Sequence, residues 1–221
     1  MARQTSQGKC NLCGKTFSKQ AMTRHLDKCK QEHSQRDTGT KRILHLQVEG
    51  RHAREYWLHI EMPADAKLQD LDRFLRKIWL ECCGHLSAFT IAGQTYDVSP
   101  EGDPWSGRKP KGMSAKLGDV LEPGVKFEHE YDFGSTTELA LKVVAQRQGA
   151  LKSIVILARN DPPNIPCGVC GKPAAQVCTQ CMYEGPKGWL CEEHALEHEC
   201  GEDYFLPVVN SPRVGVCGYT G

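Results

Sequence analysis

The chain has 221 residues, of which 39% are hydrophobic and 25% are charged, and its formal net charge is +1. These proportions suit a globular protein of one or two domains and exclude a largely disordered chain. No apolar run approaches the roughly 18 residues that cross a bilayer, and the first residues, MARQTSQGKC, lack the apolar segment of a secretion signal. We therefore expect a cytoplasmic protein that contacts no membrane, whose twelve cysteines stay reduced and serve metal binding rather than disulfides.

The first element is a compact Cys/His unit within residues 1–30. Its sequence CNLCGKTFSKQAMTRHLDKC has the spacing C-x2-C-x11-H-x3-C, in which a turn supplies two thiolates and a helix supplies a histidine and a cysteine one turn apart. Phe17 and Met22 lie between the two pairs, where a small core is needed. Burial alone cannot fold so small a unit. We expect a CCHC zinc finger with the ligands Cys10, Cys13, His25 and Cys29.

Basic side chains are concentrated at this end of the chain. Residues 1–42 carry ten Lys and Arg against three Asp and Glu, whereas residues 161–221 carry three against eight. A basic arm can bind a phosphate backbone. The candidates for nucleic-acid contact are Lys15, Lys19, Arg24, Lys28 and Lys30. The ending HLDKC also resembles the ubiquitin-binding fingers of DNA-repair proteins, which implies a protein contact at Asp27. A solvated basic face and a purely structural finger are the alternatives.

The middle segment, residues 41–160, follows a polar linker at 31–40 and is the only stretch long enough to bury a large core. Leu44, Leu46 and Val48 alternate with polar residues, and a second alternation runs from Tyr56 to Met62, which predicts two half-buried strands. AKLQDLDRFLRKIWL has apolar residues at three- and four-residue intervals, which predicts a helix capped by Asp65. Cys82 and Cys83 follow this helix, and we expect them to be buried thiols.

Strands return in the second half of this segment. VKFEHEYDF alternates, Gly134 allows a turn, the next strand begins near Leu139, and SIVILA predicts a fully buried strand. The fold class expected is therefore α+β, a mostly antiparallel sheet with one main helix, flanked by small zinc-finger modules. A long loop at residues 99–113 contains Trp105 among basic residues, and Trp105 either stacks on a base or holds the loop against the core.

Several landmarks of residues 41–160 resemble a known family. They are a strand pair, a helix ending in Trp79, GHLSAF with His85, and EYDFG from Glu130 to Gly134. Together they are similar to the plasmid pRi ORF-3-like family, also labelled insertion-element passenger TnpR-like. The resemblance implies an α+β fold and an association with mobile elements, with no established activity. In that family a Trp and a His commonly follow the Tyr-Asp-Phe-Gly turn, whereas this chain has Thr137 and Leu139 there.

Four polar residues of this segment are candidates for a site: His85, His129, Tyr131 and Asp132. The competing interpretation is structural. His129 alternates with apolar residues and is then a core histidine with a hydrogen-bond partner, while Asp132 caps the turn. The role of His85 stays open. No Gly-rich loop or His-Arg-Asp loop accompanies the DFG sequence, so a kinase is not indicated.

The tail, residues 161–221, begins with the stiff connector DPPNIP and contains nine further Cys and His ligands. Their order resembles B-box and related cross-brace fingers, in which the first and third ligand pairs hold one ion and the second and fourth hold another. That resemblance implies one site of Cys167, Cys170, Cys191 and His194. It implies a second site of Cys178, Cys181, His198 and Cys200, with Cys217 as the alternative last ligand.

Eight ligands for two ions leave no open coordination position, so a catalytic zinc is not expected. HALEH has Ala195 where a zinc protease has glutamate, and a deaminase-like PCGVC lies far from any matching His-x-Glu. The sequence therefore predicts three zinc ions in a non-enzymatic, nucleic-acid-associated or regulatory accessory protein of a mobile element. A protein-protein adaptor is the first alternative, and an enzyme with a pocket in the middle domain is the second.

Overall fold

The computed structural model describes residues 6–33, 39–100 and 110–221, so Trp105 lies outside the described residues. The chain divides into two compact units. The first comprises Met1–Arg76 and His85–Asp161, and the second comprises Lys77–Gly84 and Pro162–Gly221. The C-terminal boundary lies where DPPNIP begins, and the residues of the predicted N-terminal finger belong to the first unit.

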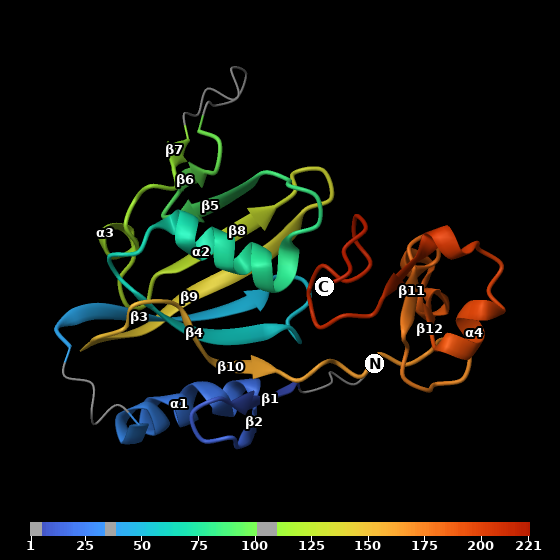
Figure 1. Ribbon diagram of the computed structural model, residues 1–221, viewed down its shortest axis with the longest axis horizontal. Helices are drawn as coiled ribbons and strands as arrows, with labels where there is room; N and C mark the ends of the chain where they lie inside the picture. Colours follow the sequence, from blue (N-terminus) through green and yellow to red (C-terminus); the bar gives the residue numbers. More distant parts are fainter. Residues whose placement is uncertain (1–5, 34–38, 101–109) are drawn as a thin grey trace. The chain divides into compact units, whose positions relative to one another are not determined.

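The first unit is built on one large sheet. Its strands are β1 (Gln7–Cys10), β2 (Thr16–Ser18), β3 (Lys41–Gly50), β4 (Trp57–Pro63), β5 (Ser87–Ile91), β6 (Gln94–Asp97), β7 (Lys111–Gly112), β8 (Lys126–Tyr131), β9 (Thr137–Gly149) and β10 (Val155–Asn160). Its helices are α1 (Lys19–His33), α2 (Leu68–Leu75) and the short α3 (Leu117–Val120). The strand order is β2-β1-β10-β4-β3-β9-β8-β5-β6-β7 (Figure 1). Every pair in the described sheet is antiparallel except β6 with β7, which confirms the predicted α+β class with a mostly antiparallel sheet.

The register separates the two faces of this sheet. Val48, Leu141 and Phe127 lie opposite one another on β3, β9 and β8, so they share one face. Helix α2 packs on this face, because Asp72 of α2 contacts His129 of β8. Helix α1 packs on the opposite face, near β10, β4 and β3 (Figure 1).

Burial of the strands follows from the two helices. All seven residues of β4 are buried, rather than every second one, because both of its faces are covered. The prediction of a fully buried strand at SIVILA is wrong, since Val155 at the start of β10 is exposed. Only the middle of β10, at Leu157 and Ala158, packs in a core.

The main helix starts and ends differently from the prediction. The cap residue is Lys67, whose backbone N–H donates to the Asp70 carboxylate at 2.9 Å. The predicted cap, Asp65, instead pairs with Lys41 at 2.9 Å. After α2 the chain makes a single π-helical turn, η1 (Arg76–Leu80), and then leaves helical geometry before Cys82.

The N-terminal residues extend the large sheet. Gly8 and Cys10 of β1 pair with Asn160 and Ala158 of β10. A shared core joins these elements and consists of Cys10, Met22, Leu26, Cys29, Trp57, Leu157 and Ala158. Helix α1 continues to His33, three residues into the predicted linker. The finger is therefore built into the edge of the sheet.

The second unit carries a small three-stranded sheet in the order β12-β11-β13. Its elements are β11 (Gln176–Cys178), η2 (Met182–Glu184), η3 (Pro186–Gly188), β12 (Trp189–Leu190), α4 (Glu192–Leu196), η4 (Glu202–Tyr204) and β13 (Phe205–Pro207). Such short elements bury little, and the cluster around Leu190 includes two cysteines, Cys167 and Cys191. Among the described residues of the whole chain, none forms a helix with the length and apolarity to cross a membrane.

Candidate metal centres and their surroundings

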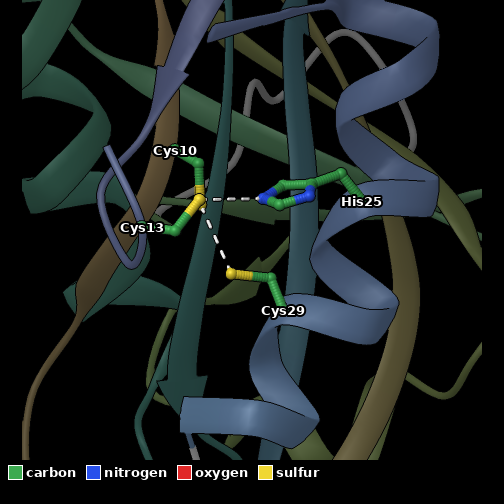
Figure 2. Close-up of side chains that lie close together, drawn as sticks. All are labelled: Cys10, Cys13, His25 and Cys29. Carbon is green, nitrogen blue, oxygen red and sulfur yellow. Dashed lines mark hydrogen bonds between the residues drawn. The ribbon is translucent and has the colours of Figure 1, made fainter. Parts of the chain in front are cut away.

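The four predicted N-terminal ligands converge. Figure 2 shows Cys10, the last residue of β1, and Cys13, on the turn after it, facing His25 and Cys29 on α1. The Cys13 Sγ lies 3.3 Å from His25 Nε2, and the Cys10 and Cys29 sulfurs are 4.0 Å apart. All four ligand atoms lie within 4.8 Å of one another, so this group can hold a metal ion.

Local sequence explains this arrangement. Gly14 has a φ of 75°, and its backbone N–H donates to the Cys10 carbonyl at 2.8 Å, which closes the turn between the two thiols. His25 and Cys29 are four residues apart on α1, so their side chains lie on one helix face. Burial, with the nearby Lys15 charge, lowers the pKa of His25, which keeps the imidazole neutral and able to bind a metal.

The tail brings together two further groups, each with the predicted members. In one, His194 Nδ1 lies 3.1 Å from Cys191 Sγ and 3.7 Å from Cys167 Sγ, and the Cys170 and Cys191 sulfurs are 3.8 Å apart. In the other, the Cys181 and Cys200 sulfurs are 3.7 Å apart, and Cys178 and His198 complete the group. The fourth member of this second tail group is thus Cys200, whereas Cys217 lies in a different group.

These distances fit a tetrahedral ion. Metal–sulfur bonds of about 2.3 Å and metal–nitrogen bonds of about 2.0–2.1 Å give S···S edges near 3.8 Å and S···N edges near 3.6 Å. His198 supplies a second test, because its Nε2 is buried and has no hydrogen-bond partner among the described residues. A buried nitrogen of this kind calls for a ligand. Three thiols surround it, so the group is compatible with zinc.

Thiol ionisation in the first tail group also suits metal binding. Burial raises the pKa of the Cys167 thiol. Hydrogen bonds from the backbone N–H groups of Cys170, Cys191 and Val169 outweigh burial and lower the pKa to about 6. Cys167 is therefore largely a thiolate near neutral pH, and the thiolate is the form that binds metals.

The five candidate nucleic-acid contacts fall into two sets. Lys15, Arg24 and Lys28 are exposed. Lys19 instead forms an ion pair with Glu49 and donates to the Arg54 carbonyl at 3.1 Å. Lys30 lies 3.6 Å from Glu61 and 2.9 Å from His45 Nδ1, beneath α1. Lys19 and Lys30 therefore attach α1 to the sheet.

Sequence reasoning missed the polar chain in which Lys30 takes part. Because an ammonium group only donates, His45 Nδ1 accepts from Lys30, and His45 Nε2–H donates to His59 Nδ1 at 2.9 Å. His59 Nε2–H then faces Thr23 Oγ1 of α1 at 3.5 Å. Burial and the Lys30 charge hold the pKa of His45 at about 2 and that of His59 at about 3. The available signal was the pair of histidines at polar positions of two apolar strands.

The polar residues of the middle segment take structural positions. His129 is fully buried and bonds to Asp72 at 2.8 Å, which confirms it as a partnered core histidine. The Asp132 carboxylate accepts from the backbone N–H groups of Gly134 and Ser135 at 3.1 and 3.2 Å, which confirms the turn cap. His85 Nε2 lies 3.5 Å from the Asp132 carboxylate, and the Tyr131 hydroxyl accepts from the His85 backbone N–H at 3.3 Å.

A hollow of about 600 Å³ lies on the α1 face of the sheet, beside strands β9, β8 and β5. Its charged lining residues are Glu49, Arg54, Lys126, Glu128 and Lys142. Among the described residues, the lining of this hollow includes no Cys, His or Ser.

One prediction about the thiols is wrong. Cys82 is only half-buried and Cys83 is exposed, because the helix ends before them.

Comparisons with known proteins concern mainly the first unit. The model of the plasmid pRiA4b ORF-3-like protein family matches residues 42–171, more than half of the chain. Among solved structures, a protein of unknown function from Methanosarcina mazei Go1 is similar, with 19% identity and a TM-score of 0.46, over 54% of this chain and 70% of that chain. No curated protein matches the chain. The N-terminal ligands and most tail ligands lie outside the family match.

Proposed function

The chain belongs to the plasmid pRiA4b ORF-3-like family, and we propose that it is a zinc-stabilised, non-enzymatic cytoplasmic protein that binds nucleic acid as an accessory of a mobile element. The family is uncharacterised, so the proposal rests on the Cys/His groups and on the charges beside them.

Zinc is the proposed metal for the three groups described above. Each group combines thiols with one imidazole, the donor set of structural tetrahedral zinc sites. Four protein ligands leave no position for a substrate, which supports a structural rather than a catalytic ion. Metal binding would give the N-terminal Cys/His segment and the tail the folding free energy that their short elements do not supply.

The row of exposed cations beside the first group carries the nucleic-acid proposal. Arg24 and Lys28 are four residues apart on the exposed side of α1, so they lie one above the other. Lys15 lies close enough to His25 to lower its pKa, and His25 directly follows Arg24. The zinc-held turn and helix thus present three cations from two segments, and such a row suits successive phosphates.

Salt dependence of binding tests this proposal. Each phosphate neutralised on duplex DNA contributes about −0.9 to the slope of log K against log salt, so three contacts give a slope of about −3. The triple variant Lys15→Ala, Arg24→Ala and Lys28→Ala should flatten the slope to near zero without releasing zinc. Lys152→Ala, an exposed cation of the loop before β10, is the matched control and should leave the slope unchanged. An unchanged slope in the triple variant contradicts the proposal.

A protein-protein adaptor is the second candidate, and exposed apolar side chains of the tail favour it. Val169, Tyr183 and Leu196 are 64, 77 and 84% exposed. Exposed apolar side chains often mark surfaces that a protein partner covers. The adaptor candidate predicts that a protein stays bound after nuclease treatment during purification from the native host. Leu196→Ser combined with Val169→Ser should release that protein, whereas loss of all bound material with nuclease favours nucleic acid.

A further inference from the structure

Three cysteines that the three zinc groups do not use gather within the second unit. The Cys82 and Cys83 sulfurs are 3.6 Å apart, and the Cys83 and Cys217 sulfurs are 3.9 Å apart. These separations match the S···S edge of about 3.8 Å expected around a tetrahedral zinc ion. They also match the 3.7–4.0 Å separations of the three groups described above. All three sulfurs lie within 4.8 Å of one another.

Two segments far apart in the chain bring these cysteines together. Trp79, at the end of the π-helical turn, accepts a hydrogen bond through its carbonyl from Ser211 Oγ at 2.6 Å. Ser211 Oγ accepts in turn from the Arg213 backbone N–H at 2.9 Å. Both Trp79 and Ser211 are buried, so this clamp fixes the C-terminal segment beside residues 77–84.

The backbone at Cys217 is unusual. Its φ of 49° places a non-glycine residue in the left-handed region, between Gly215 and Gly218, which also have positive φ. Such a conformation is strained, and it persists where the surroundings fix it. Here it is held by Tyr219, which is buried and whose N–H donates to the Val216 carbonyl at 3.0 Å.

A buried cation stands beside these thiols. The Arg213 side chain is fully buried, and its guanidinium donates to Cys82 Sγ at 3.5 Å. Three thiolate ligands around a divalent ion leave a net negative charge, which a guanidinium at this distance offsets.

We propose that Cys82, Cys83 and Cys217 bind a fourth zinc ion, which ties the C-terminal segment to residues 77–84. Thiolates are the ligands that select zinc and similar soft ions over magnesium or calcium. Three protein ligands leave the remaining coordination position open to water. This site is independent of nucleic-acid binding.

Zinc content of the full-length protein provides the first test. Protein purified without chelator should contain four zinc ions per chain, and Cys83→Ser and Cys217→Ser should each contain three. Because Cys83 and Cys217 are exposed, serine at either position should leave the fold intact, as the far-ultraviolet circular dichroism will show. Ser135→Ala, at an exposed position of the first unit, is the control and should retain four ions. Three ions in the unmodified protein, unchanged in both variants, would overturn the proposal.

Alkylation provides a second test, because cysteines that only pack in the structure would react equally with and without zinc. Exposed thiols react readily with iodoacetamide unless a metal holds them. Mass spectrometry of the zinc-loaded protein should find Cys83 and Cys217 protected at least tenfold relative to the same protein after chelation. Equal modification of Cys83 and Cys217 with and without zinc would contradict the proposal, even where the other groups keep their zinc. A failure of nucleic-acid binding would leave both measurements unaffected.

Discussion

His45 and His59 are neutral, although charged side chains lie close to both of them. Lys30 and Thr23 of α1 face them from above, Glu61 and Arg147 lie beside them on the sheet, and Lys19 adds a distant positive charge. The Glu61 carboxylate accepts from Arg147 at 2.7 Å and lies 3.6 Å from Lys30, so one carboxylate offsets two cations. The histidines carry the hydrogen bonds between helix and sheet without adding a third positive charge.

Stability should therefore fall with acidification, partly through these histidines. The pKa of His59 is lowered to about 3 in the folded protein, below its ordinary value of about 6.5, so below pH 6.5 only the unfolded chain gains the proton. This contribution is complete above about pH 7 and is lost as the pH falls. From about pH 7.5 to about 5.5 it amounts to about 1.4 kcal/mol of unfolding free energy.

The variant His59→Gln should remove that part of the pH dependence. Urea denaturation of the variant and of the unmodified protein at each pH measures it, because protonation of the metal ligands affects both alike. His52→Gln, which changes a histidine that is 78% exposed, should keep the original slope. An identical slope in His59→Gln would show that His59 is not held neutral.

Strand β1 is the element that joins the N-terminal Cys/His group to the large sheet. Its pairing with β10 requires close approach of two backbones at Gly8, where a Cβ atom would come within 2.2 Å of the Arg159 carbonyl oxygen and 2.7 Å of the Trp57 ring. Position 8 therefore requires glycine because a side chain would clash with β10 and Trp57, and not because the backbone adopts a conformation that only glycine allows. On the same side of β1, facing β10, the Gln7 carbonyl accepts from the Asp161 N–H at 2.8 Å.

Gly8→Ala should separate β1 from β10. Overpacking of this kind costs about 1–3 kcal/mol, and denaturant unfolding should show a loss of that size. Hydrogen exchange at the Asp161 amide should accelerate, since its acceptor moves away. Gln7→Ala, which alters only an exposed side chain of the same strand, should change neither quantity. If the finger were an independent module, Gly8→Ala would leave the exchange of Asp161 unaltered.

Ligand sets near in sequence were the part of the site that the sequence could predict. Cys10 and Cys13 are fixed by a short turn, and His25 and Cys29 by one turn of helix, so local geometry alone defines the half-sites. The pairing of β1 with β10 could not be predicted in this way, because the two strands lie about 150 residues apart in the sequence and share no local pattern. The faces of β8 and β9 were predictable from alternation, whereas the burial of both faces of β4 depends on where α1 packs.

At the scale of the whole molecule, Cys82, Cys83 and Cys217 illustrate the same limit. Adjacent cysteines at the end of an apolar helix indicate buried thiols when only neighbours in sequence are considered. The π-helical turn, which ends the helix at Leu80, and the Ser211 clamp together bring Cys217 across a separation of 134 residues. Neither feature has a sequence signature as strong as a spaced pair of cysteines.

Metal removal should affect the two units unequally. The tail elements have two to five residues each and little core, so chelation should unfold residues 162–221. In the first unit, loss of the ion should expose β1, α1 and the adjoining strand β10, while β3, β9 and β8 keep a core of their own. Hydrogen exchange with mass spectrometry, before and after chelation, measures both effects.

Protection of β3, β8 and β9 is the decisive observation in that experiment. Their amides should exchange at nearly the same rate with and without chelator, and re-addition of zinc should restore protection at both ends. Complete loss of protection throughout the sheet would show that the N-terminal group is needed for the central core to fold.

The pairing of β1 with β10 also has a consequence for synthesis on the ribosome. At roughly 5–20 residues per second, β10 leaves the ribosome on the order of 10–30 s after β1. During that interval the nascent N-terminus presents an unpaired strand edge, a feature that invites aggregation. Early zinc loading would keep the turn and helix folded while the strand waits for its partner. Nascent chains stalled before Val155 should therefore bind zinc yet leave β1 open to proteolysis, and chains extended past Asp161 should protect it.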